Sequence, residues 1–137
     1  MAQKQLSQFE VAVIALLSSI DCYKSENYVS SIILSGAARQ VLNDLCISNQ
    51  LPTTAELIGE STQKTTKQVH DFIAETYNSL KHADRNPGQQ ISVSEDEARM
   101  LIIAAASDLT RLNPQINENI KQIIYFAKSF QENSNGK

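Results

Sequence analysis

The sequence predicts an all-α fold, an up-and-down bundle of five main helices plus one short helix. Apolar residues recur at three- and four-residue steps along most of the chain, which is the period of an amphipathic helix. Only four Gly and three Pro occur in 137 residues, which favours long regular elements over loops. This length fits one domain with its own core. We therefore expect a single domain over residues 1–137, frayed at 1–5 and 131–137.

The first two predicted helices form a hairpin. The first carries its apolar residues over about 6–20, and the polar string "DCYKSEN" then predicts a turn. The second helix runs over about 27–47, and its segment "SGAA" places four small residues in mid-helix. Gly36 costs about 1 kcal/mol relative to Ala in a helix interior. We therefore expect it to allow the close approach of another backbone.

The middle of the chain holds a short helix, a long helix and a loop. The segment "TAELIGE" predicts the short helix, with Thr53 or Thr54 as its cap. The long helix resumes near Gln63 and continues through "YNSLKH". Its apolar stripe consists of Val69, Phe72, Ile73, Thr76, Tyr77 and Leu80. A Pro-Gly turn within 83–94 marks the one long loop.

Two further helices complete the predicted bundle. Ser94 and Glu97 fit a capping box, ahead of a segment that is apolar nearly all round at 100–106. We place this helix at the centre of the bundle. Asn113 and Pro114 would stop it and start the last helix, with Asn113 as cap and Pro114 at the first helical position. One face of the last helix carries Ile116, Ile120, Ile123, Ile124, Ala127 and Phe130.

The overall charge excludes long-range attraction to nucleic acid. The formal net charge is −3 and the pI is about 5.3, so contact with RNA or DNA would need a local basic patch. The apolar run "VAVIALL" near the start is too short for a membrane span and lacks the basic start of a signal peptide. We expect a cytoplasmic protein with no membrane contact.

Cys22 and Cys46 are the only two cysteines. They would lie at opposite ends of the first hairpin, roughly 30 Å apart at about 1.5 Å per residue, whereas a disulfide needs Cα atoms within ~7 Å. We expect buried free thiols. No His spacing completes a zinc site, and neither a Gly-rich phosphate loop nor a Ser-His-Asp order is visible. We therefore expect no metal and no cofactor.

The stretch "YNSLKHAD" is the main candidate for a site. At about 100° per residue, Asn78 and His82 share the helix face opposite the apolar stripe, so both can meet one ligand or one partner surface. We place Lys64, Lys67 and Asp71 on the same face.

Ordinary helix-end chemistry explains the same residues. A His or Lys in the last helical turn is favoured by the helix dipole, and Asn-Pro-Gly with a nearby Asp is turn chemistry. We interpret His70, on a flank of the same helix, as an isolated residue without a role.

The segments "YKSENYVSSIILSGAARQVL" and "YNSLKHAD" together carry a family resemblance. The first is similar to the opening hairpin of the HEPN superfamily, the helical nucleotide-binding domains of higher eukaryotes and prokaryotes. The second resembles the family's motif of an Arg, a polar residue and a His, with Asn78 and His82 in register and Tyr77 in place of the Arg. "NSLKHADRNP" also resembles an uncharacterised bacterial subgroup with an N-x-L-K-H-A-D motif. The resemblance spans about residues 6–130 and implies a HEPN-like bundle.

What the resemblance implies about function depends on Tyr77. In the family's ribonucleases the His activates the ribose 2′-hydroxyl or protonates the leaving oxygen, and the Arg stabilises charge on the phosphate. Tyr77 cannot supply that fixed positive charge, and losing such a contact costs on the order of a hundredfold or more in rate. The resemblance thus implies a non-catalytic module that binds a nucleotide, RNA or a protein partner. Its expected ligand-binding residues are Asn78, Lys81, His82, Asp84 and Arg85.

The alternative is a degenerate, metal-independent endoribonuclease of toxin type. His82 would then be the general acid or base, and an antitoxin-like protein would be the partner. A purely structural subunit is the third possibility. The resemblance also implies a homodimer that pairs through the helices carrying the motif, and Gly36 with its small neighbours would permit close helix contact.

Overall fold

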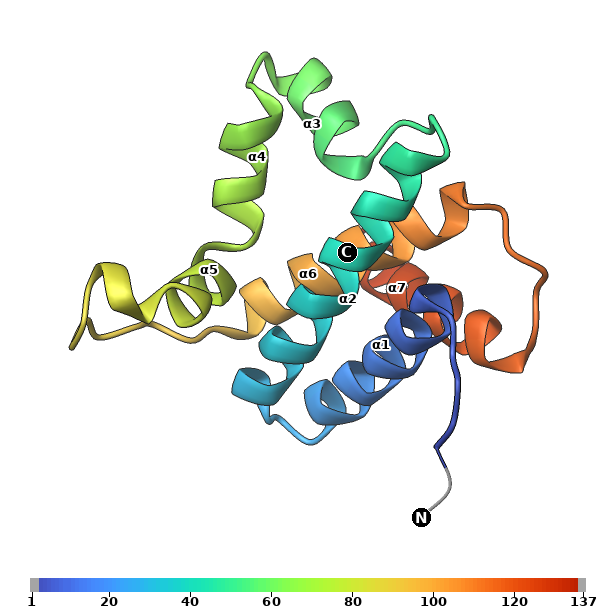
Figure 1. The fold of residues 1–137 in the computed structure, drawn as a ribbon, viewed down its shortest axis with the longest axis horizontal. Coiled ribbons are helices and arrows are strands. Elements are labelled where there is room, and N and C mark those ends of the chain that lie inside the picture. The colour runs from blue at the N-terminus through green and yellow to red at the C-terminus, as the bar shows by residue number, and fades with distance from the viewer. Residues whose placement is uncertain (1–2, 136–137) are drawn as a thin grey trace.

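The computed structural model describes residues 3–135, and over this range the chain is all-α (Figure 1). Its elements are α1 (Gln8–Lys24), α2 (Tyr28–Ser48), α3 (Thr54–Thr62), α4 (Thr66–Ile73), α5 (Glu75–Lys81), the 3-10 helix η1 (Ala83–Arg85), α6 (Glu95–Arg111) and α7 (Glu118–Asn135). The count differs from the predicted five main helices plus one short helix, because the predicted long middle helix is two helices, α4 and α5. No helix in the described range is long and apolar enough to cross a bilayer.

Small polar side chains bring α1 and α2 together in the predicted hairpin. The Ser19 hydroxyl of α1 donates to the Ser31 carbonyl of α2 at 2.7 Å, and the two hydroxyls lie 3.0 Å apart. Both serines are fully buried. Because these buried polar groups are hydrogen-bonded, they can lie between the helices without a large desolvation cost.

The helix predicted to lie at the centre, α6, does so: it contacts α1, α2, α3, α4 and α7. Its buried residues are Ala98, Leu101, Ile102, Ala104, Ala105, Ala106, Asp108 and Leu109. Ser94 caps the helix by accepting the Glu97 N–H at 3.2 Å. This is the half of the predicted capping box that forms. In the other half, Glu97 Oε2 is buried and has no hydrogen-bond partner among the described residues.

Two clusters of buried apolar residues share α6. One joins α1, α2, α6 and α7 into a four-helix bundle. The other lies beneath α3, α4 and α5, which we call the arm and which extend away from the bundle in Figure 1. The second cluster comprises Ile32, Ala55, Val69, Ile73, Ala74, Ala98, Leu101 and Ala104. Residues of α2 and α6 therefore hold the arm on the bundle.

A buried carboxylate connects α3 to α6. Asp108 is 1% exposed, and its Oδ1 accepts the Thr54 N–H at 2.7 Å and the Thr54 hydroxyl at 2.8 Å. Arg111 Nη1 donates to the same Oδ1 at 3.2 Å and to Thr54 Oγ1 at 2.7 Å. Thr53, one of the two predicted caps, accepts the Glu56 N–H and is the cap of α3. The carboxylate thus lies at the helix N-terminus, where the dipole favours negative charge.

The predicted long helix breaks at Ala74, which corrects the single-helix prediction. Ala74 has φ −113° and ψ 29°, outside helical geometry, and α5 then runs in a new direction (Figure 1). Two contacts fix that direction: the Thr76 hydroxyl donates to the Ser92 carbonyl at 3.2 Å, and the Tyr77 ring packs on Gly36 of α2. An apolar stripe cannot reveal this break, because both halves keep the same period.

Gly36 makes room for an aromatic ring, and not for another backbone as predicted. A Cβ at this position would overlap the ring carbons of Tyr77. The contact lies within one chain, so Gly36 no longer supports the predicted homodimer.

The prediction that Asn113 caps the last helix and Pro114 is its first residue is wrong on both points. Asn113 lies just after the end of α6 and adopts the left-handed conformation, at φ 49°. Its N–H donates to the Thr110 carbonyl at 3.0 Å. Asn tolerates this conformation at helix C-termini. The last helix begins at Glu118, where Asn117 Oδ1 accepts the Ile120 N–H at 2.9 Å. Asn117 is therefore the cap.

Both cysteines are free, as predicted. Cys46 is fully buried, and its thiol donates to the Asp108 carbonyl at 3.4 Å. Burial raises the pKa of the Cys46 thiol to about 11. Cys22 is only half-buried, so the prediction of buried thiols holds for Cys46 alone.

Candidate functional site

The five predicted ligand-binding residues divide between two places. Asn78 and Lys81 of α5 line a pocket against α2. His82, Asp84 and Arg85 lie beyond it, at the end of α5 and in η1. Asp84 and Arg85 are exposed and His82 is half-buried. The hydrogen bonds of His82 and Arg85 within residues 3–135 are backbone ones, from His82 N–H to the Asn78 carbonyl and from Arg85 N–H to the His82 carbonyl, each at 3.0 Å.

The break at Ala74 also separates the polar face that was predicted for one long helix. Lys64 lies in the turn before α4 and Asp71 on α4, and both line a different, apolar cavity. Lys67 pairs with Asp71 at 2.8 Å on the exposed surface. Asn78 is therefore not a neighbour of these three residues, contrary to the sequence prediction.

The pocket that contains Asn78 and Lys81 has a volume of about 250 Å³ and lies between α2, α4 and α5. Its walls come from three helices because α5 packs on α2 after the break. The lining residues are Gly36, Arg39, Gln40, Asn43, Asp44, His70, Ala74, Tyr77, Asn78 and Lys81. We call this cavity the Arg39 pocket. It brings in two side chains that sequence analysis missed, Arg39 and His70.

Arg39 and His70 form a hydrogen-bonded pair in this pocket. Arg39 is only 6% exposed, and its Nη2 bonds to His70 Nδ1. Because a guanidinium can only donate, His70 Nδ1 accepts and carries no proton. Burial lowers the pKa of His70, and the positive charge of Arg39 lowers it further. His70 is therefore a neutral partner that leaves the charge of Arg39 uncompensated.

No carboxylate in the described part of the chain forms a direct ion pair with Arg39. Asp44 lines the pocket, and both Asp44 and Asp108 act on Arg39 only through longer-range attraction. Burial lowers the pKa of the Arg39 guanidinium. Buried cations are normally paired with an anion. A buried Arg at a pocket without a direct counter-ion is thus the main electrostatic feature of the site.

Two further polar groups complete the pocket. Lys81 is exposed, and its Nζ donates to Gln40 Oε1 at 3.0 Å, so a second cation lies at the rim. Asn43 is 6% exposed, and its Oδ1 has no hydrogen-bond partner among residues 3–135. The pocket therefore combines two cations with an amide oxygen that has no hydrogen-bond donor among the described residues.

This arrangement suits the binding of an anionic group. Arg presents several donors in a fixed plane, which matches the oxygens of a phosphate or carboxylate. The volume of about 250 Å³ is smaller than the roughly 300–1,000 Å³ of pockets that enclose a whole small molecule. The Arg39 pocket can therefore hold one phosphate or carboxylate, with the rest of the ligand outside.

Comparison with known proteins gives no match, whether with protein-family models, with curated proteins or with solved structures. In the part of the chain that the structure describes, no three His, Cys, Asp or Glu side chains gather in a way that could hold a metal ion. The geometry and charge of the Arg39 pocket are therefore the main indication of function.

Proposed function

We propose that the protein is a non-catalytic, HEPN-like bundle whose Arg39 pocket binds a phosphate group of a nucleotide or of RNA. The observation that supports this most is the buried Arg39 guanidinium without a direct counter-ion. Asn78 and Lys81, expected from the sequence as ligand residues, line the same pocket. The other three expected residues, at the end of α5 and in η1, lie outside this pocket and are not part of the proposed phosphate site. We also propose a cytoplasmic location, since free thiols persist in reducing compartments.

The separation of Arg39 from His82 favours binding over the endoribonuclease alternative. Cleavage needs a general acid or base and a charge-stabilising group at the same phosphate. His82, the acid or base of the endoribonuclease alternative, is not part of the pocket that holds Arg39. Tyr77, at the position of the family's Arg, packs its ring on Gly36. These positions support a module that binds phosphate without cutting it.

Binding of adenosine 5′-monophosphate and of a short single-stranded RNA, measured by calorimetry, tests this function. Arg39→Gln should weaken both about ten- to a hundredfold, because a hydrogen bond to a charged group contributes about 1.5–3 kcal/mol. Arg85→Gln is the matched control, since it removes the same charge from an exposed position outside the pocket. It should change affinity little.

Two other outcomes would contradict the proposal. Loss of binding in Arg85→Gln but not in Arg39→Gln would move the site to the face around His82. RNA cleavage by the unmodified chain that stops in His82→Ala would establish the endoribonuclease alternative, and an antitoxin-like partner would then be sought.

The proposal retains the homodimer that the resemblance implies. Leu80 on the motif helix is 42% exposed and offers apolar surface for pairing. Light scattering at micromolar concentration should give about twice the 15.2 kDa chain mass. A stable monomer would remove this part of the proposal while leaving the Arg39 pocket intact.

A further inference from the structure

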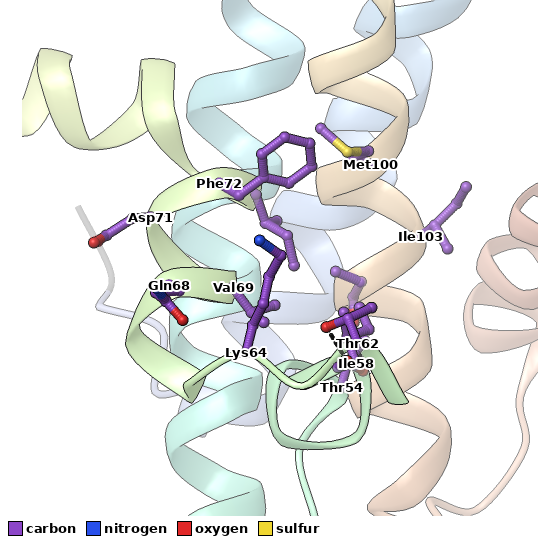
Figure 2. A pocket seen from close by; sticks show the side chains of 12 residues that line it. Thr54, Ile58, Thr62, Lys64, Gln68, Val69, Asp71, Phe72, Met100 and Ile103 are labelled. Atoms are coloured by element: carbon purple, nitrogen blue, oxygen red, sulfur yellow. Dashed lines mark hydrogen bonds between the residues drawn. The ribbon is translucent and has the colours of Figure 1, made fainter. Parts of the chain in front are cut away.

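A second cavity, of about 630 Å³, lies between α3, α4 and α6 (Figure 2). Helix α4 lines both cavities, with His70 at the Arg39 pocket and other side chains here. Most of the second lining is apolar: Ile58 from α3, Val69, Phe72 and Ile73 from α4, and Met100, Ile103 and Ala104 from α6. Its volume falls within the roughly 300–1,000 Å³ of small-molecule sites.

The apolar walls of this cavity are left partly uncovered by the fold. Phe72 is 68% exposed and Ile58 is 37% exposed. Large apolar side chains that face a cavity and remain exposed mark a surface that a ligand can cover.

The charged residues of the lining are Lys64 and Asp71, and they differ in orientation. In Figure 2 the Asp71 carboxylate points away from the cavity, and it is already paired with Lys67 at 2.8 Å. The Lys64 side chain extends into the cavity in the same view. It forms no ion pair within the described residues. The inward-facing charge is thus one unpaired cation.

The turn between α3 and α4 holds Lys64 in this place. Its N–H bonds to the Gly59 carbonyl at 2.9 Å, and Gln63 before it takes the left-handed conformation at φ 59°. Gly59 is needed for this turn, because a Cβ there would lie 2.7 Å from the Lys64 carbonyl oxygen. The ammonium group is therefore carried on a fixed backbone and not on a free loop.

We propose that this cavity binds an amphipathic carboxylate, a medium-length hydrocarbon chain that ends in one carboxylate group. The chain lies against Phe72 and the apolar side chains of α6, and the carboxylate pairs with Lys64. Charge complementarity decides the class of ligand: one cation in an apolar cavity matches one anionic group on an apolar body. A neutral hydrocarbon leaves Lys64 unpaired, and a nucleotide brings polar groups for which these walls have few partners.

A methyl NMR titration of the full chain with decanoate, kept below its micelle concentration, tests the site. The chain has two methionines. Met100 lines the cavity. The Met100 methyl signal should shift saturably with decanoate. Each methylene added from octanoate to decanoate should tighten binding about fourfold.

Two variants and an uncharged probe test whether the carboxylate of the ligand pairs with Lys64. Lys64→Gln should weaken decanoate about threefold to tenfold and leave 1-decanol unchanged. Lys64 is exposed overall, so the substitution removes a charge without disturbing the core. Lys128→Gln, which removes the same charge from an exposed position on α7, should change neither affinity.

Three results would overturn the proposal. The first is a Met100 signal that does not saturate with decanoate. The second is equal affinity for decanoate and 1-decanol, or no effect of Lys64→Gln. The third is a Met100 shift that follows protein concentration without any ligand, which would show that a second copy of the chain covers the cavity.

Discussion

At the scale of single residues, the pairing of a buried Arg with a neutral His is the feature with the clearest chemical consequences. Arg39 holds His70 Nδ1 as an acceptor, so protonation of His70 requires the loss of this hydrogen bond. The folded state therefore disfavours the imidazolium ion, in agreement with the lowered pKa of His70.

Stability should fall in mild acid because of this pair. The folded-state pKa of His70 lies below its ordinary value of 6.5, so the unfolded chain binds more protons just below that pH. The stability is fully present above 6.5 and is lost as the pH falls toward the folded-state pKa. His70→Gln should reduce this loss, because Gln can accept from Arg39 without titrating.

Urea denaturation at about pH 7.5 and 5.5 measures the effect, because these two values lie on either side of the ordinary His pKa. His82→Gln is the matched control, as it replaces the other histidine and leaves the Arg39–His70 pair in place. Equal acid sensitivity in the unmodified chain and in His70→Gln would show that the pair does not control this loss.

Part of this site could have been predicted from the sequence. Ser35, Leu42 and Cys46 recur with Arg39 at helical spacing, and all four are buried on one face of α2. A cation on such a stripe indicates a buried Arg. The role of His70 could not have been predicted, because its partner is 31 residues away and the two meet only through the packing of α4 on α2.

At the scale of elements, the direction of α5 depends on a ring packed against a glycine. Gly36→Ala should destabilise the protein by up to about 2 kcal/mol, because overpacking costs about 1–3 kcal/mol and the better helix propensity of Ala returns about 1 kcal/mol. In a Tyr77→Ala background the ring is absent, so Gly36→Ala should become stabilising. Urea denaturation of the four proteins in a double-mutant cycle measures the coupling. Simple additivity would contradict the ring contact.

Some helix ends could be predicted from the sequence and others could not. The cap at Ser94 was predicted correctly, and the cap of α3 is Thr53, one of the two predicted residues, because a cap is a hydrogen bond between residues three apart. The break at Ala74 depends on contacts with Ser92 and with α2, which no local pattern contains. The cap of α7 was placed too early, because Asn113 is suited both to an N-cap and to the left-handed helix end that it adopts.

At the scale of the whole molecule, α6 joins the bundle to the arm, and we expect the two to unfold as one cooperative unit. It supplies Ile102, Ala105, Ala106 and Leu109 to the first cluster and Ala98, Leu101 and Ala104 to the second. The all-α class was predictable because helical periodicity is a local property. The way in which α3 attaches to α6 was not, since Thr54 and Asp108 are 54 residues apart.

Removing the buried carboxylate should weaken the whole fold. Asp108→Ala leaves the Thr54 N–H without its acceptor and Arg111 without its counter-ion, at a cost of about 3 kcal/mol in the free energy of unfolding. Asp96→Ala is the control, because the Asp96–Arg99 pair lies on the surface and its loss should change stability little. Urea denaturation should show a single transition, whereas separate loss of the arm would contradict the cooperative unit.

The most direct test of phosphate binding at the Arg39 pocket is an NMR titration of the two imidazole rings with adenosine 5′-monophosphate. The chain has two histidines, so each ring gives one assignable set of signals. His70 lines the Arg39 pocket and His82 does not. A phosphate bound to Arg39 should shift the His70 signals and raise the pKa of His70, while the His82 signals stay in place. Movement of the His82 signals alone, or of neither ring, would contradict phosphate binding at Arg39.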